Sequence, residues 1–306
     1  MFHHRPVLTG LALGLGLSVL ALPSFAADLA EPVPSQSSDM SAALDAAGPQ
    51  PDWTVTVGGG GLYAPAFLGS GKMKATPLPY VAVNWRDTVL LDPKGLTINA
   101  LNSYGFRAGP VLRYSLGRDT KDDRKALNGL GDLAPTLDAG GFIAYQPLPW
   151  LEAAVELRRN VMKLSDSRDK SLNRFGLNQK IKAAEGWTGD FTVGVKAPPL
   201  LGHRLMLGAE AKATWFDESY MRAVFGVTSA QAGRSGLKAY RPSGGIASIG
   251  LAADATYLIT DKTAVTLIGS YDRLIGDAAK SPVIANGRGS KDQFSVGAFV
   301  TYRFGG

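Results

Sequence analysis

The fold is decided by the final stretch of the chain, which reads QFSVGAFVTYRF at residues 293–304. Apolar side chains occupy every second position, and most of the side chains between them are polar or small. The apolar set is Phe294, Val296, Ala298, Val300, Tyr302 and Phe304, and it opposes Gln293, Ser295, Gly297, Thr301 and Arg303. A period of two indicates a β-strand with one face in apolar surroundings. Aromatic residues at both ends are typical of a strand that crosses a membrane between two interfaces.

Upstream segments carry the same kind of signal. In residues 151–158, Leu151, Ala153, Val155 and Leu157 share one face, and the charged side chains lie on the other. Twelve strands are predicted in all, with ten as the alternative. They span residues 53–63, 77–85, 88–92, 96–100, 106–116, 137–146, 151–158, 189–196, 204–216, 248–259, 264–271 and 294–304.

The connections between these segments alternate in length. One set is short, comprising residues 86–87, 101–103, 147–150, 197–203 and 260–262. The other set is long, comprising residues 64–76, 117–136, 160–188, 217–247 and 272–292, and only 93–95 breaks the pattern. Short periplasmic turns and long extracellular loops are typical of outer-membrane barrels. Hydrocarbon cannot satisfy backbone hydrogen bonds, so the strands must close on themselves. We therefore predict an all-β, transmembrane, antiparallel up-and-down barrel in a Gram-negative outer membrane. The alternative is a periplasmic all-β domain.

The N-terminal part is expected to lie outside the barrel. Residues 1–26 have a basic start at Arg5, a short apolar run and the small-x-small end Ser24-Phe25-Ala26, the pattern of a signal peptide. Residues 27–52 are rich in Ala, Pro, Ser and Asp and predict a flexible extension. Residues 53–306 then form the barrel. The chain has no cysteine, which excludes disulfides and thiolate metal sites.

Charged side chains on the polar faces of the strands are expected to point into the lumen, because they are too costly to face lipid. The lumen-facing candidates are Arg107, Arg113, Glu152, Glu156, Arg158, Asp190, Lys196, Glu210, Lys212, Asp254 and Arg303. Their mixed signs allow either a narrow water-filled pore or pairing across the lumen that seals it. Twelve strands make a smaller barrel than that of open porins, which favours a largely filled interior.

The loop over residues 217–247 also bears on whether the lumen is open or filled. Thr228 or Ser229 could cap a short helix, and the loop could then fold back into the barrel as a plug. The alternative is a mobile surface loop. The residues of this possible plug motif are Phe225, Gly226, Val227, Thr228, Gln231, Gly236, Leu237 and Tyr240.

No stretch of the sequence predicts catalysis. His203 is the one histidine left after signal cleavage, and it falls in a short turn on the periplasmic side. The run Gly58 to Gly61 lacks the Lys-Ser or Lys-Thr of a phosphate loop, so it indicates a bend or the close approach of a neighbour. No metal-ligand spacing stands out, and charges are too dispersed to indicate nucleic-acid binding. The chain is expected to be no enzyme and to hold no cofactor.

Several stretches resemble the MltA-interacting protein (MipA/OmpV) family. They are the strand from Trp53 with Gly58 to Pro65, residues 225–231 and 235–240, Gly244-Gly245, residues 270–283 and the closing strand from Phe294 to Phe304. The resemblance implies an outer-membrane protein without catalytic residues. Members are described as scaffolds linking a lytic transglycosylase to a peptidoglycan synthase, and elsewhere as porin-like or stress-related surface proteins. This chain departs from the family in placing Gly305 and Gly306 after the last aromatic residue.

The leading hypothesis is therefore a non-catalytic envelope scaffold, and it rests on the resemblance. The first alternative is a narrow porin-like channel for small solutes. The second is a surface adhesin that acts through the long extracellular loops. Outer-membrane lipid is the expected surrounding in all three cases.

Overall fold

The computed structural model describes residues 52–285 and 287–305. The predicted signal peptide, and all of the predicted extension except Asp52, lie outside the described residues. The strands are β1 Trp53–Pro65, β2 Met73–Trp85, β3 Val89–Asp92, β4 Gly95–Ile98, β5 Leu101–Ser103, β6 Phe106–Ser115, β7 Thr136–Leu148, β8 Leu151–Lys163, β9 Trp187–Lys196, β10 Leu205–Phe216, β11 Gly245–Thr260, β12 Thr263–Leu274 and β13 Asp292–Gly305.

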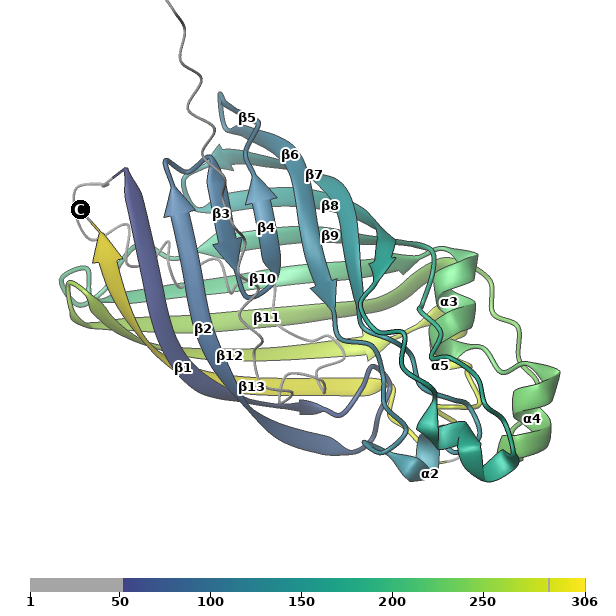
Figure 1. Ribbon diagram of the computed structural model, residues 1–306. Helices are drawn as coiled ribbons and strands as arrows, with labels where there is room; N and C mark the ends of the chain where they lie inside the picture. The colour runs from purple at the N-terminus through teal and green to yellow at the C-terminus, as the bar shows by residue number, and fades with distance from the viewer. Residues whose placement is uncertain (1–51, 286, 306) are drawn as a thin grey trace, which may run out of the picture.

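These strands form one antiparallel sheet that closes on itself (Figure 1). Consecutive strands pair with each other except β4 and β5, which both pair with β6, and β1 pairs with β13. The short strand β5 pairs with the first three residues of β6 and continues β4 beyond an interruption at Asn99 and Ala100. Counting β4 and β5 as one, the wall has twelve strands, so the predicted twelve-stranded barrel is confirmed.

The closing seam between β1 and β13 runs through ten residue pairs, from Thr54 opposite Gly305 to Tyr63 opposite Val296. It depends on glycines. A β-carbon at Gly60 would lie 2.1 Å from the carbonyl oxygen of Ala298, and one at Gly58 would lie 2.2 Å from that of Val300. The glycine run therefore marks the close approach of a neighbouring strand, as the sequence predicted.

Exposure alternates along the strands, and the exposed face is apolar. In β13, Phe294, Val296 and Val300 are 53–58% exposed, whereas their neighbours Ser295 and Thr301 are buried. Exposed aromatic residues near the short turns are Trp53, Trp85, Phe106, Tyr145, Trp150, Tyr257, Tyr302 and Phe304. Those near the long loops are Tyr63, Tyr114, Trp187 and Phe294. The two groups form the girdles expected of a lipid-facing belt. No helix in the described part of the chain has the length and apolar character needed to span a membrane.

The turns at one end are tight. Arg86 and Asp87 both have positive φ, which suits a hairpin with the twist of its strands. One prediction at this end is wrong: residues 101–103 are not the turn but strand β5, and the turn is Tyr104-Gly105. The hairpin is longer than periodicity indicated because β5 resumes pairing after the interruption.

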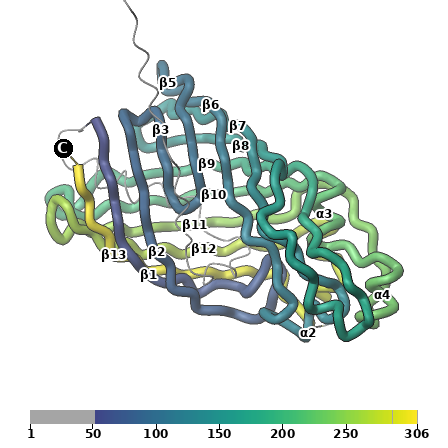
Figure 2. Tube along the Cα trace, viewed as in Figure 1, coloured from purple at the N-terminus to yellow at the C-terminus, as the bar shows by residue number. Residues whose placement is uncertain are grey.

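The long loops contain helices, which gather at the opposite end of the barrel (Figures 1 and 2). They are α2 Arg124–Leu127, the 3₁₀ helix η3 Lys170–Phe175, α3 Glu218–Phe225, α4 Ser229–Ser235 and α5 Gly276–Ala279. Only α4 was predicted from the sequence. The end with short turns faces the periplasm by the usual rule for such barrels, so the helices lie on the outer side.

Candidate functional site

An interior charge ladder runs along the wall formed by β6 to β9. Arg113 of β6 is its central residue. The Nε and Nη2 atoms of Arg113 donate to the two carboxylate oxygens of Glu156 at 3.0 and 2.6 Å. Its Nη1 donates to the hydroxyl of Thr97 at 2.9 Å and to the carbonyl of Leu96. This two-pronged contact fixes the planes of both groups.

The ladder continues through Arg158 of β8. Its Nη1 lies 3.2 Å from Glu156 Oε1 and 2.5 Å from Asp190 Oδ2, and only 8% of its side chain is exposed. Asp190 of β9 also accepts a hydrogen bond of 2.8 Å from Thr214. Arg107 pairs with Glu152 nearer the short turns. We use the name interior charge ladder for Arg107, Arg113, Glu152, Glu156, Arg158 and Asp190.

The other lumen-facing candidates lie outside the ladder. Glu210, Lys212 and Asp254 are half-buried on β10 and β11, Lys196 is exposed at the end of β9, and Arg303 reaches the carbonyl of Asp261 at 3.4 Å. The ladder joins strands that are adjacent or next but one, so its pairs run along the wall and do not bridge the lumen. The alternation of side chains along each strand placed the charged residues on one face. It carried no information on which strands their ion pairs would join.

An apolar cluster on the wall formed by β1, β2, β12 and β13 was missed by the sequence reasoning. Tyr80 and Phe299 are 1% and 6% exposed, and their rings meet edge to face with centroids 6.4 Å apart. Leu62, Ala82 and Ile268 pack with them, and Leu78 and Leu116 lie at the border. One signal was present: Phe299 is the single aromatic residue on the polar face of residues 293–304.

The outer loops meet in an outer cap with two apolar clusters. In the first cluster, Phe67, Leu127, Val227 and Val283 come from four different loops and are at most 2% exposed. In the second, Phe216, Met221 and Phe225 pack on Leu274 and Ile284. Because the four loops leave the barrel at different points of its rim, their contact spans the outer mouth. We use the name outer cap for residues 66–72, 117–135, 217–244 and 275–291.

The eight residues of the possible plug motif all lie in the outer cap or at its helix ends. Phe225, Val227 and Leu237 are buried in the two clusters. Val227 and Tyr240 exchange backbone hydrogen bonds, and the Tyr240 hydroxyl donates to the carbonyl of Asp277. Thr228, one of the two caps that the sequence offered, caps α4 and forms a capping box with Gln231. Gly226 and Gly236 end α3 and α4. The loop thus packs on its neighbours at the mouth.

Removing the side chain of Thr228, the N-cap residue of helix α4, should loosen this part of the outer cap. The Thr228→Ala variant loses the side-chain acceptor for the backbone N–H of Gln231, which should cost about 1 kcal/mol of local stability. Hydrogen exchange of the α4 amides should speed up about fivefold, given that tenfold corresponds to about 1.4 kcal/mol. The control is Ser229→Ala, at the first residue of the helix. Equal exchange in both variants would show that the box does not hold α4.

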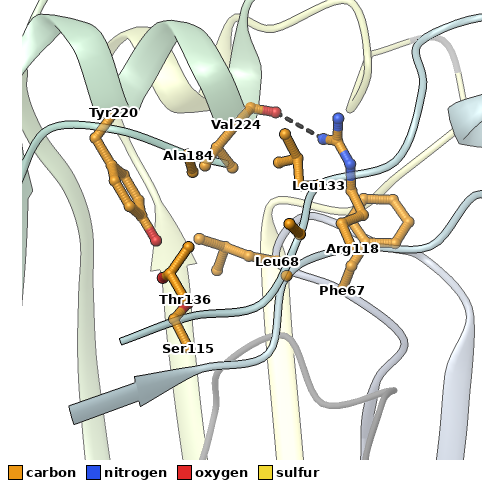
Figure 3. A pocket seen from close by; sticks show the side chains of 11 residues that line it. Phe67, Leu68, Ser115, Arg118, Leu133, Thr136, Ala184, Tyr220 and Val224 are labelled. Carbon is orange, nitrogen blue, oxygen red and sulfur yellow. Dashed lines mark hydrogen bonds between the residues drawn. The ribbon is translucent and has the colours of Figure 1, made fainter. Parts of the chain in front are cut away.

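Arg118 joins three loops of the outer cap to one another. Its guanidinium is buried, donates to the carbonyl of Val224 at 2.8 Å and lies 5.9 Å from the ring centre of Phe67. Burial lowers the pKa of Arg118 to about 10, and the charge of Asp132 offsets part of that effect. A cavity of about 40 Å³ lies beside it (Figure 3). That volume holds only a few water molecules and is well below that of a small-molecule site.

The described residues contain no group of three or more His, Asp or Glu side chains placed to hold a metal ion. His203 is exposed in the turn between β9 and β10, with φ of 69°. This turn lies at the end of the barrel opposite the outer cap.

Comparison with known proteins gives a consistent set of relatives. The family model described as MltA-interacting protein MipA matches residues 57–304. The outer membrane protein Omp26La of Vibrio anguillarum is 24% identical over 265 residues, which is 81% of this chain and 95% of that protein.

Solved structures of similar shape include the NanC porin, with TM-score 0.39, 9% identity and coverage of 81% of this chain and 98% of that one. Another is the COG4313 outer membrane channel of Pseudomonas putida F1, with TM-score 0.40, 13% identity and coverage of 82% and 94%.

Proposed function

The chain belongs to the MltA-interacting protein MipA family, and from this premise we propose that it is a non-catalytic scaffold of the outer membrane. Its periplasmic end would contact peptidoglycan-remodelling enzymes, namely a lytic transglycosylase and a peptidoglycan synthase. The membrane barrel would serve as the anchor, and the contacts would be made outside the lipid.

The packing of four loops against one another at the outer end is the observation that carries this proposal. Four loops meet in the outer cap, where Phe67, Leu127, Val227 and Val283 are at most 2% exposed. A barrel whose outer mouth is covered by packed apolar side chains is poorly suited to passing solutes along its axis. It is well suited to holding a periplasmic surface in a fixed place at the membrane.

The β5–β6 hairpin offers such a surface. It extends beyond the neighbouring turns at the end away from the outer cap (Figure 1). Tyr104 at its tip is 97% exposed, and Leu101 is 51% exposed. Tyr104 has φ of 52°, a conformation that L-residues seldom adopt and that holds the side chain at the tip. Exposed aromatic residues are enriched at protein contacts. The described chain begins at Asp52, at this same end.

A pull-down from solubilised membranes tests the proposal. The full chain should retain the lytic transglycosylase, and a variant without residues 27–51 should lose it. A Leu101→Ser, Tyr104→Ser variant should weaken retention about tenfold, as expected when an exposed aromatic anchor is removed. Lys280→Ser, whose exposed side chain lies in the outer cap, is the control. Retention at full strength in both test variants would remove the scaffold mechanism.

The second candidate is a narrow channel for small solutes. The observation in its favour is the interior charge ladder, because its pairs line the wall without bridging the lumen. Conductance measured on the purified barrel separates this candidate from the scaffold.

A further inference from the structure

Much of the positive charge of the chain lies at one place on the outer rim, where β8 and β9 are joined by a long loop. Residues 159–187 carry seven basic and three acidic side chains, a net of +4 against +6 for the whole chain. All the basic residues except Lys163 are exposed. A concentration of charge of one sign attracts ligands of the opposite sign. The basic residues are Arg159, Lys163, Arg168, Lys170, Arg174, Lys180 and Lys182.

The loop that carries most of these cations has a defined backbone. We use the name basic lobe for residues 165–182. Its two arms pair with each other, and the N–H of Asp169 donates to the carbonyl of Gln179 at 2.8 Å. Its base is tied to the neighbouring loop, because the N–H of Ala134 donates to the carbonyl of Lys182 at 2.7 Å. Backbone hydrogen bonds thus set the positions from which the cationic side chains extend.

Two cations of the basic lobe lie opposite each other. Arg168 and Lys180 form an antiparallel bridge, so their side chains extend on the same side of the two arms. Like charges directly opposite each other destabilise a pair of strands. An anion bound between these two side chains would offset their repulsion. Phosphate suits this place, because guanidinium and ammonium groups are its usual protein ligands.

The acidic residues of the basic lobe neutralise only part of its charge. Asp166 lies 2.7 Å from the Nζ of Lys163 and 3.7 Å from that of Lys180. The hydrogen bond from Lys163 holds the pKa of Asp166 below its usual value, so this carboxylate is charged at neutral pH. Asp169 is buried and accepts hydrogen bonds from two backbone N–H groups. The five exposed cations of the lobe therefore share a single exposed carboxylate.

Arg159 places a further cation on the lipid-facing surface below the basic lobe. It follows Val155 and Leu157 on the outward face of β8 and lies opposite Trp187 of the outer aromatic girdle. Its guanidinium lies over the ring of Trp187, 5.9 Å from the ring centre. A charged side chain on the lipid face is costly at the midplane and tolerated near the interface. Arg159 therefore lies at the level of the lipid headgroups.

A second outward arginine at the outer rim has a different neighbour. Arg273 of β12 lies opposite Asp292 of β13, and its Nη1 is 2.6 Å from that carboxylate. The hydroxyl of Tyr271 donates to the same carboxylate at 2.7 Å. The chain thus gives Arg273 an acid and gives Arg159 an aromatic ring. A ring contacts the face of a guanidinium, and the N–H groups along the edge stay suited to oxygen acceptors.

We propose that the outer end of the β8–β9 hairpin binds a phosphate-bearing glycolipid of the outer leaflet. Arg159 binds phosphate at the level of the headgroup, and the acyl chains lie beside Trp187. Arg168 and Lys180 bind phosphate on the sugars that rise above the leaflet. Charge complementarity and place both select this partner, since clustered cations at a membrane surface bind anionic lipid. The inference rests on the outer-membrane location and goes beyond the scaffold function.

A binding titration of the folded full chain in uncharged dodecyl maltoside micelles tests the proposal. The probe is a short-chain lipopolysaccharide with phosphate on its inner core sugars, and native mass spectrometry counts the bound lipid. Each cation near an anionic lipid surface contributes a factor of about five to binding. Arg159→Gln should therefore weaken binding about fivefold, and the double variant Arg168→Gln, Lys180→Gln about twentyfold. Unchanged affinity in these variants would overturn the proposal.

The matched control removes two cations elsewhere on the outer side. Arg273 faces outward beside Asp292, and Lys280 lies in the outer cap beside Asp277. The double variant Arg273→Gln, Lys280→Gln changes the net charge as the double variant of the lobe does. It should bind the probe within about twofold of the unchanged protein, because a paired exposed cation contributes little. An equal loss in both double variants would mean that net charge alone attracts the lipid, and the site would fall. Folding of every variant is checked by its electrophoretic shift on heating.

Two further probes identify the chemistry and the source of the ligand. The unchanged protein should bind the same glycolipid at least about tenfold less tightly after chemical dephosphorylation, since charge-assisted contacts to phosphate are lost. Inorganic phosphate at the same phosphate concentration should not displace the intact glycolipid, because the acyl chains add to its affinity. Equal binding of both forms of the glycolipid would remove phosphate as the recognised group. Displacement by inorganic phosphate would remove the lipid as the partner.

Discussion

The Gly60→Val variant is expected to lose the folded barrel. A β-carbon at Gly60 would lie 2.1 Å from the carbonyl oxygen of Ala298 and 2.5 Å from the ring of Phe299. The first of these is backbone in the closing seam, so relief requires β1 and β13 to separate. Separation exposes the edges of both strands in hydrocarbon. We expect a loss of more than about 4 kcal/mol, at the upper end of single substitutions. Electrophoresis should show no heat-modifiable folded form.

Gly59→Val is the matched control for this prediction. A β-carbon at Gly59 meets only the carbonyl oxygen of Leu78, at 3.9 Å, and the position faces outward. Both variants add the same side chain to adjacent residues of one strand, so β-propensity and side-chain volume cancel. The Gly59 variant should fold at nearly the yield of the unchanged protein. Folding of Gly60→Val at that yield would show that the seam tolerates a wider spacing.

Removing Arg158 should destabilise the barrel strongly without preventing its assembly. Arg158 lies between Glu156 and Asp190, and its side chain is 8% exposed. In Arg158→Ala the two carboxylates lose their shared cation, although Thr214 still donates a hydrogen bond to Asp190. Breaking a buried pair from one side costs about 3–5 kcal/mol. Urea unfolding in lipid vesicles should show a lower midpoint with little change in slope.

An exposed pair provides the comparison for this variant. Arg86 and Asp52 are 2.9 Å apart, but their side chains are 59% and 70% exposed. Solvent screens such a pair, so Arg86→Ala should shift the urea midpoint far less than Arg158→Ala does. A loss of similar size in the two variants would mean that the ladder is as well hydrated as the surface. The interior of the barrel would then be wetter than the burial of Arg158 indicates.

The strands could be predicted from the sequence because lipid and lumen impose a period of two on every crossing segment. Residues 293–304 show this most clearly, since each outward residue is apolar. The same period failed at residues 101–103. There the wall is interrupted at Asn99 and Ala100, and pairing resumes as β5, a strand of three residues that are all exposed. Three residues are too few to show a period of two.

The outer cap could not be predicted for a different reason. Its helices have four to eight residues, too few to be stable alone, and they depend on contacts between distant loops. Phe67 and Val283, for example, meet although more than two hundred residues separate them in the chain. Only α4 could be predicted, because an N-cap residue such as Thr228 is a local signal in the sequence.

The sequence predicted which face of the strands carries the charged residues of the interior charge ladder, but not how they pair. Alternation placed Arg113, Glu156 and Arg158 on one face of their strands. The ion pairs between side chains of β6 and β8 depend on the stagger of neighbouring strands, which the sequence of one strand does not contain. Tyr80 and Phe299 were missed because an inward aromatic residue looks like an exception to the alternation.

Planar-bilayer recording from the purified, folded protein tests the central claim most directly. Four outer loops pack together at the outer end of the barrel. The account therefore predicts no steady single-channel conductance at moderate voltage. A stable ohmic conductance, present in the unchanged protein, would contradict it and establish the channel in place of the scaffold.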